Sequence, residues 1–179
     1  IDFFPIGDAY ISVLDDGYGM SKEELIAAMQ YGSRNPLEKR DEYDLGRYGL
    51  GMKTASLSQC RILTVLSKKD GVVSGAQWNL NHVKEAEAWS LLLIDLQEAK
   101  KYPSFDKLEP LYNGTLIIWQ DLDKFAIGEN NITDAFSRKM EIIREHLSLV
   151  FHRYLSGEPG LKKIEIRMNN EIIIPQDPF

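Results

Sequence analysis

Cysteine, long apolar runs and excess positive charge are all scarce in this sequence. Cys60 is the only cysteine among 179 residues, which excludes a disulfide framework and a cysteine metal cluster and favours a reducing compartment, the cytoplasm or a eukaryotic nucleus. The longest apolar stretches are far too short to span a bilayer, so no membrane association is expected. The formal net charge of −6 excludes a basic field over the whole chain, so a contact with DNA is not expected to come from this domain's net charge.

What is present indicates an ordinary globular domain. Hydrophobic residues make up 44% and charged residues 27%, and 179 residues suffice for one domain with a sizeable core. Apolar alternation between turn signals predicts strands at residues 1–4, 10–14, 61–67, 72–80, 88–96, 114–120, 162–168 and 172–174. Helices are expected at 24–30, 51–57 and 133–155. This order predicts an α/β (α+β) two-layer sandwich, with a mostly antiparallel mixed sheet and helices on one face.

Two groups of large apolar residues are expected in the core. Helix 133–155 carries one at intervals of three and four, namely Phe136, Met140, Ile143, Leu147, Val150 and Tyr154. Trp78, Trp89 and Trp119 each fall in a predicted strand and are expected to be buried there. The three histidines form no ligand spacing with cysteines or acids, so no metal site is expected in this chain.

The segment 15–20, with the sequence DDGYGM, follows a predicted strand and precedes a helix that starts with a capping box. Asp15 is a carboxylate fixed at a strand end, so it can accept a hydrogen bond from the exocyclic amine of adenine, where guanine presents a carbonyl. Gly17 and Gly19 would let the main chain approach a flat ligand. The alternative is a simple turn, since Asp and Gly are common turn formers.

The segment 46–54, with the sequence GRYGLGMKT, places three glycines at the start of a predicted helix. Main-chain N–H groups at a helix start favour phosphate, and Lys53 adds a positive charge. A Walker loop is excluded because Met52 stands directly before Lys53, and a dinucleotide fingerprint is excluded because no apolar strand precedes the glycines. The alternative is a glycine-rich hinge. The charged residues 33–48 are expected to form a mobile lid.

The order of these motifs, together with Gly114-Thr115 at the start of a predicted strand, resembles the GHKL or Bergerat-fold superfamily of gyrase, heat-shock chaperone, histidine kinase and MutL ATPases. The stretch 44–58 looks like the MORC branch. The resemblance implies that Asp15 binds adenine, that Thr115 reaches the base together with it, usually through water, that Met20 packs on the base and that Lys53 lies near the terminal phosphate. The implied ATP site consists of Asp15, Gly17, Gly19, Met20, Gly46, Tyr48, Gly49, Leu50, Gly51, Met52, Lys53, Thr54 and Thr115.

One part of the family pattern is not found in the sequence. The family's first motif is a helix with a glutamate that polarises the attacking water and an asparagine that holds Mg²⁺. The resemblance places that helix, and so the catalytic glutamate, upstream of Ile1. It also implies an ATP-binding domain at 1–160 that lacks this helix, and the start of a transducer-like domain at 161–179. This chain alone is therefore expected to hydrolyse ATP negligibly.

For the intact protein, the resemblance implies slow, Mg²⁺-dependent ATP hydrolysis. In the family, hydrolysis is coupled to lid closure and to an ATP-dependent homodimer, and the expected setting is a DNA-processing or remodelling machine. Two alternatives stay open. One is the catalytic domain of a histidine kinase, which the long helix 133–155 and the hairpin after it disfavour. The other is a non-hydrolysing module in which nucleotide switches a protein interface.

Overall fold

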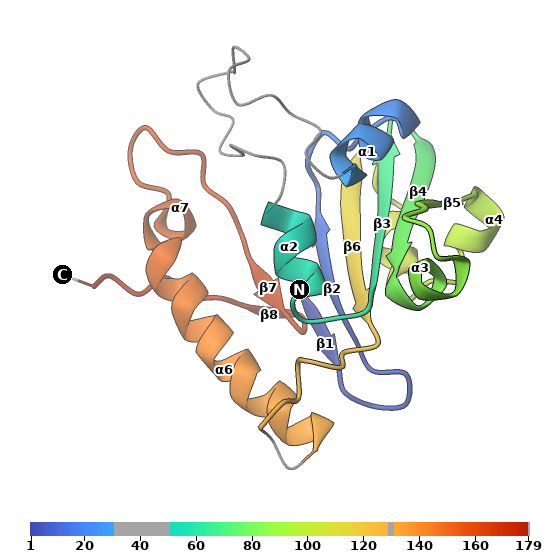
Figure 1. The fold of residues 1–179 in the computed structure, drawn as a ribbon. Helices are drawn as coiled ribbons and strands as arrows, with labels where there is room; N and C mark the ends of the chain where they lie inside the picture. The colour runs from blue at the N-terminus through green and yellow to red at the C-terminus, as the bar shows by residue number, and fades with distance from the viewer. Residues whose placement is uncertain (31–50, 129–130, 179) are drawn as a thin grey trace, which may run out of the picture.

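In the computed structural model, residues 1–30, 51–128 and 131–178 are described, and a six-stranded sheet of order β1-β2-β6-β3-β4-β5 forms their centre (Figure 1). Every pairing in this sheet is antiparallel. The strands are β1 (Asp2–Phe4), β2 (Tyr10–Asp15), β3 (Ile62–Lys69), β4 (Val72–Asn79), β5 (Leu92–Ile94) and β6 (Gly114–Gln120). The predicted two-layer arrangement around a mostly antiparallel sheet is confirmed.

The strand β6 lies between β2 and β3, although it follows both in the sequence. It is apolar on both sides: Leu116 and Ile118 face one layer, whereas Ile117 and Trp119 face the other. A strand at the centre of a sheet needs this composition, since both of its faces are covered. The predicted bounds of this strand, 114–120, are confirmed.

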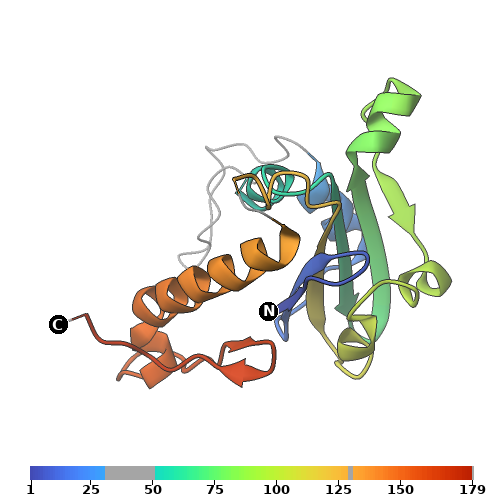
Figure 2. The same ribbon diagram turned by 90° about the horizontal axis from the view of Figure 1, so that it is seen from below.

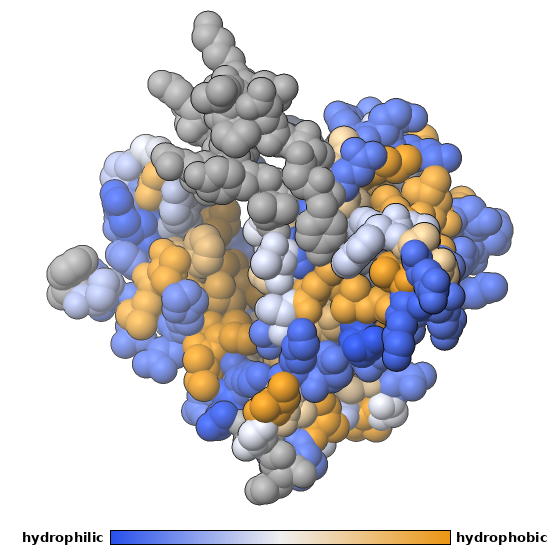
Figure 3. All heavy atoms as spheres, viewed as in Figure 1, coloured by the Kyte–Doolittle hydropathy of each residue, from blue (hydrophilic) through white to orange (hydrophobic). Residues whose placement is uncertain are grey.

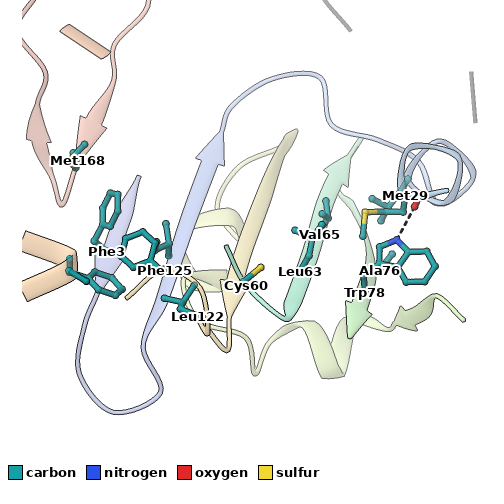
Figure 4. Packing of buried hydrophobic residues seen from close by; sticks show 14 of the residues in the cluster. Phe3, Met29, Cys60, Leu63, Val65, Ala76, Trp78, Leu122, Phe125 and Met168 are labelled. Carbon is teal, nitrogen blue, oxygen red and sulfur yellow. Dashed lines mark hydrogen bonds between the residues drawn. The ribbon is translucent and has the colours of Figure 1, made fainter. Parts of the chain in front are cut away.

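The first face of the sheet is covered by α1 (Lys22–Met29), α2 (Gly51–Leu57) and α6 (Ile132–Val150) (Figure 1). The buried side chains between them form the larger core, part of which Figure 4 shows. Leu63 and Val65 of β3 are fully buried there, and the rings of Phe3 and Phe136 meet edge to face at 5.9 Å. Each such side chain contributes roughly 1.5–3 kcal/mol through burial.

The second face of the sheet is also covered, by two short helices that the sequence analysis did not predict. They are α4 (Leu96–Ala99) and α5 (Phe105–Leu108). Phe105 and Leu108 pack with Leu66 of β3 in a second, smaller core. Four-residue helices give too little periodicity to be found in a sequence, because one turn is shorter than any apolar repeat.

The helix α1 is held at both ends. At its start Ser21 and Glu24 form the predicted capping box, and Lys69 of β3 pairs with Glu24 at 2.7 Å. At its end the Trp78 indole N–H donates to the Met29 carbonyl at 2.9 Å (Figure 4). These contacts fix the helix over β3 and β4, because last-turn carbonyls have no partner within their own helix.

The predicted strand at 88–96 is mostly wrong. Only Leu92–Ile94 pairs, as the short edge strand β5, and the chain before it forms α3 (Leu80–Ala86). Asn79 starts α3, because its side-chain oxygen accepts from the N–H groups of the second and third residues that follow. The strand predicted at 72–80 includes Asn79, so the sequence pattern placed this capping residue at the end of a strand and not at the start of a helix.

The three tryptophans have different surroundings. Trp78 is buried as expected, and Trp119 is half-buried with its indole N–H donating to the Ser56 hydroxyl at 2.8 Å. Trp89 is 68% exposed, so its expected core position is wrong. Its segment forms no strand, and its ring and that of Trp78 are arranged edge to face, with centroids 5.6 Å apart.

The predicted helix 133–155 is divided into α6 and α7 (His152–Ser156), which meet at Phe151. Phe136 is buried as expected, but Val150 is 54% and Tyr154 41% exposed, so the predicted buried stripe does not continue to the end. In Figure 3 hydrophobic residues gather over this part of the surface and over the sheet beside α2. None of the helices in the described ranges has the length and apolar character needed to cross a membrane.

A second, two-stranded sheet confirms the predicted hairpin around Asn169-Asn170. It consists of β7 (Arg167–Met168) and β8 (Glu171–Ile172), so its strands are shorter than expected. Both asparagines have positive φ, as residues in such a turn require. The hairpin lies beside β1 and the N-terminus (Figure 2). The domain boundary expected between 160 and 161 stays a prediction.

Candidate functional site

Three polar side chains form a row across neighbouring strands at the end of the sheet where α1 begins (Figure 1). Asp15 of β2 is the register partner of Thr115 of β6, and Thr115 is the register partner of Ser67 of β3. Register partners on one sheet face have Cβ atoms about 4.5–5.5 Å apart. The structure therefore brings together the acid and the threonine that the motifs singled out.

Asp15 presents a carboxylate at the exposed end of this row. Its Oδ1 accepts a hydrogen bond from the Gly17 N–H at 2.9 Å, which fixes the side chain against the following turn. Within the described part of the chain its Oδ2 has no hydrogen-bond partner. The arrangement leaves one carboxylate oxygen as an acceptor, on a strand that is paired on both sides, with β1 and with β6.

The other end of the row is a buried hydroxyl pair. Ser67 Oγ and Thr115 Oγ1 are 2.9 Å apart, and Ser67 Oγ also accepts from the Met20 N–H at 2.8 Å. Ser67 is fully buried and Thr115 is 8% exposed. Through Met20 this pair is tied to the turn that carries Asp15, so the turn and the sheet hold one fixed geometry.

Beneath the row lies a partly exposed apolar strip. Val13 and Ile117 occupy the next register position on the same face and are only half-buried, whereas their neighbour Val65 is fully buried. Met20 and Met52 are half-buried and also pack at the edge of the core on this face. An apolar strip below a carboxylate and a hydroxyl can receive a flat, polar-edged ring.

Two glycines are required where the turn after β2 packs against β3 and where β6 begins beside β2. Gly19 has φ of +65°, and a Cβ there would lie 1.9 Å from the Lys68 carbonyl oxygen. At Gly114 a Cβ would lie 2.5 Å from the Asp15 carbonyl oxygen. Packing within the fold therefore already requires glycine at both positions. The close approach to a ligand that is expected at Gly17 and Gly19 stays a prediction.

Lys53 is a residue of α2, and its side chain reaches the end of α1. Its Nζ donates to the carbonyl oxygens of Ala28 at 2.7 Å and Gln30 at 2.6 Å, and the residue is fully buried. Burial lowers the pKa of the Lys53 ammonium. The structure thus assigns Lys53 a part in joining α2 to α1, which sequence reasoning missed. Its expected place near a terminal phosphate stays a prediction, and such a contact must compete with these carbonyls.

Of the other residues predicted to bind phosphate, some lie in α2 and some lie outside the described residues. Gly51 and Thr54 are exposed on the first turn of α2, and Met52 is half-buried beside them. The predicted helix at 51–57 is confirmed. The lid expected at 33–48 lies outside the described residues, and so do four predicted site residues, Gly46, Tyr48, Gly49 and Leu50.

The described residues offer no metal site of the usual kind, since no group of three His, Cys, Asp or Glu side chains could hold an ion. Cys60 is buried, as expected for a small apolar residue, and burial raises the pKa of its thiol to about 12. Two open hollows of about 520 Å³ lie elsewhere, one lined by Tyr102 and Lys101, the other by Leu122 and Ile132. Neither includes a residue of the row.

Sequence reasoning missed Ser67, Val13 and Ile117. The signal for the two apolar residues was available, because a residue two positions from Asp15 or Thr115 in a strand must share its face. Ser67 could be placed only with the pairing of β3 and β6, which brings together two positions far apart in the sequence.

Comparison with known proteins gives a consistent result. A family model described as histidine kinase-, DNA gyrase B-, and HSP90-like ATPase matches residues 3–115, more than half of the chain. The chain is 35% identical over 75 residues to the ATPase morc-1 of Caenorhabditis elegans, a match that covers 41% of this chain and 8% of that protein. The chain therefore spans only a small part of this curated relative.

Solved structures of topoisomerase II are similar to the chain at low identity. The ATPase and transducer domains from Balamuthia mandrillaris match 94% of this chain and 40% of that one, with 19% identity and a TM-score of 0.49. The ATPase region from Saccharomyces cerevisiae matches with the same coverage, 18% identity and a TM-score of 0.44.

Proposed function

Because this chain belongs to the family of histidine kinase-, DNA gyrase B- and HSP90-like ATPases, we propose that the row containing Asp15 and Thr115 binds the adenine base of ATP. The family expected from the motifs is confirmed, and so is the likeness to the MORC branch. The observation that carries the proposal is the register pairing of the exposed Asp15 with the nearly buried Thr115.

The chemistry of this pair suits adenine. The base presents a donor, its 6-amino group, next to an acceptor, N1. The free oxygen of Asp15 supplies an acceptor, and the Thr115 hydroxyl, which can donate or accept, lies beside it on the paired strand. The ring then rests on the strip formed by Val13 and Ile117, with Met20 at its edge. Guanine reverses donor and acceptor at these two positions and is disfavoured.

The phosphates are proposed to lie toward the start of α2, where Gly51 and Thr54 are exposed. The exposed residues agree with this placement, which also depends on the glycines at 46 and 49. Mg²⁺ belongs to the proposal for the intact protein, but the described residues supply no ligand cluster for it. The proposal for the described residues is therefore limited to nucleotide binding, and the catalytic glutamate stays a prediction for a segment before Ile1.

For the longer protein we propose slow ATP hydrolysis coupled to closure of the lid segment 33–48 and to homodimerisation. The 35% identity to ATPase morc-1 supports a MORC-like ATPase over the histidine kinase alternative. The cytoplasmic or nuclear location, the DNA-processing or remodelling role and a transducer beginning near residue 161 are further parts of this proposal.

The base-binding proposal can be tested by adding ATP to the isotope-labelled 179-residue chain and following its amide NMR signals. The amides of Gly17, Met20 and Thr115 are expected to move with ATP and much less with GTP, whereas signals of the hairpin 167–172 stay unchanged. Equal responses to ATP and GTP would contradict base recognition by Asp15. No response at these amides at millimolar ATP would contradict nucleotide binding at this face of the sheet.

A further inference from the structure

Two open hollows adjoin at the end of the sheet opposite the row of Asp15 and Thr115, where β6 ends (Figure 1). Each has a volume of about 520 Å³, and Gln120, the last residue of β6, lines both. One hollow is bounded by α4 and the turn after it, and the other by the loop between β1 and β2 and the segment after β6. Because they share this side chain, they together make up the Gln120 groove.

The side-chain amide of Gln120 is able to form hydrogen bonds that the chain itself does not use. The residue is half-buried between the two hollows, and within the described ranges its side chain has no hydrogen-bond partner. An amide offers two donor hydrogens and an acceptor oxygen. It can therefore bond both the N–H and the C=O of one main-chain unit, as the Asn169 amide does with Phe3 in this structure.

Acidic side chains outnumber basic ones around the Gln120 groove. Five carboxylates line it, those of Asp8, Asp95, Glu98, Asp121 and Asp123. The basic lining residue is Lys101. Asp8 and Glu98, one at each hollow, are exposed, and their carboxylates have no hydrogen bond or ion pair in the described part of the chain. Burial raises the pKa of Tyr102 in the first hollow, and the negative charge of Glu98 raises it further.

The second hollow also keeps an excess of negative charge, over an apolar floor. Asp121 and Asp123 pair with the same guanidinium, that of Arg61, at 3.7 and 3.6 Å. Two carboxylates that share one cation retain a net negative charge. Between them and the loop before β2 lie the half-buried side chains of Ile62 and Ile132. The groove thus combines acidic rims with apolar contact area.

Three kinds of ligand suit this groove poorly. No group of three His, Cys, Asp or Glu side chains in the described ranges could hold a metal ion. The acidic rims repel the phosphates of a nucleic acid. Small-molecule sites enclose most of their ligand, and these hollows are open. An extended peptide that lies across both hollows, with basic side chains at the rims, fits both the shape and the charge.

We propose that the Gln120 groove binds an extended segment of a partner protein that is rich in lysine or arginine. The basic side chains of the segment pair with Asp8 and Glu98, their methylene stems and the apolar side chains between them lie on the floor of the groove, and the Gln120 amide bonds one peptide unit. Thr115 is five residues from Gln120 along β6, roughly 17 Å away, so the segment and a nucleotide at the row use separate groups.

The test adds a capped seven-residue peptide, in which lysine alternates with valine, to the isotope-labelled 179-residue chain. The side-chain amide signal of Gln120 and the main-chain amide signals of Ala9 and Glu98 are expected to move as the peptide is added. The same peptide with glutamate in place of lysine is the control and should leave these signals unchanged. The amide of Thr115 should not move with either peptide, so the outcome does not bear on nucleotide binding at the row.

Glu98→Gln combined with Asp8→Asn should weaken binding of the lysine peptide about 3- to 10-fold, within the range that two exposed ion pairs support. Glu85→Gln combined with Asp70→Asn is the matched control, because both of these acids are exposed and neither lines a hollow. An unmoved Gln120 signal at millimolar peptide, equal responses to the two peptides, or unchanged affinity in the Glu98 and Asp8 variant would each overturn the proposal. Spermine, which carries the same charge as the lysine peptide, should bind more weakly, and equal binding would overturn the role given to the peptide main chain.

Discussion

The side-chain amide of Asn169 forms two hydrogen bonds with the main chain of Phe3. Its oxygen accepts from the Phe3 N–H at 2.7 Å, and its nitrogen donates to the Phe3 carbonyl at 3.3 Å. Phe3 lies in β1, the edge strand of the main sheet, and Asn169 is in the turn of the small hairpin. One asparagine side chain thus closes part of an open sheet edge, which would otherwise present unpaired main-chain groups.

Replacing Asn169 with Ala is expected to lower the free energy of unfolding by about 1–2 kcal/mol, because the Phe3 N–H loses its acceptor. Urea denaturation measures the change. Asn170→Ala is the matched control, since Asn170 has a positive φ in the same turn but no hydrogen bond to β1. Equal losses in the two variants would show that backbone strain in the turn, rather than the contact with Phe3, is responsible.

The Asp15→Asn variant is expected to bind ATP about 10- to 100-fold more weakly while remaining folded. An amide keeps the volume of the side chain but removes the charge, and hydrogen bonds to charged groups contribute about 1.5–3 kcal/mol. Calorimetric titration beside a thermal melt gives both quantities. Asp16→Asn serves as the control, because Asp16 is also exposed but comes after the end of β2. Unchanged affinity in folded Asp15→Asn would remove Asp15 from the site.

Lys53→Met is expected to lower the free energy of unfolding by about 1–3 kcal/mol, because the carbonyls of Ala28 and Gln30 lose a charged donor in the interior. The control is Lys22→Met, which removes an exposed lysine from α1 and should have little effect. Chemical denaturation measures both. Unaltered stability combined with weaker ATP binding would instead support the phosphate role and contradict the structural one.

The buried thiol of Cys60 predicts a pH dependence of stability. Its pKa is raised from 9.0 to about 12 by burial, so the folded protein keeps a proton that the unfolded chain releases above about pH 9. Stability due to this group therefore falls as the pH rises from 9 toward 12, by at most about 1.4 kcal/mol per pH unit. Cys60→Ala should show a shallower fall in denaturation experiments across this range, and parallel curves would contradict the assignment.

Much of the sheet could be predicted because its strands carry their own signals. β6 is an uninterrupted apolar run after a glycine, and its bounds were correct to the residue. The segment around Trp89 carries a similar apolar signal but is mostly not a strand, because only Leu92–Ile94 finds a partner at the edge of β4. Whether an apolar segment pairs is decided by the available sheet edge, which local sequence does not contain.

In the candidate site, as in the sheet, only residues that a local sequence motif marks could be predicted. Asp15 lies in a local motif with a turn and a capping box, so local chemistry makes it a candidate, with a simple turn as the alternative. Ser67 has no motif, and its part in the row depends on two strand pairings that join distant segments. Lys53 was expected to point to a ligand because it follows glycines, but its long side chain reaches carbonyls of α1 that a sequence cannot place beside it.

The central position of β6 also has a consequence for synthesis of the protein. β2 and β3 are made well before β6, yet they meet only through it, so a growing chain first holds two separate groups of strands. Asp15 has no Thr115 beside it until that residue has left the ribosome. ATP stabilises only a form that binds it, so it cannot assist the early stages of folding. Joining such distant strands late is a slow step, and until it is complete the unpaired edges of β2 and β3 are open to aggregation.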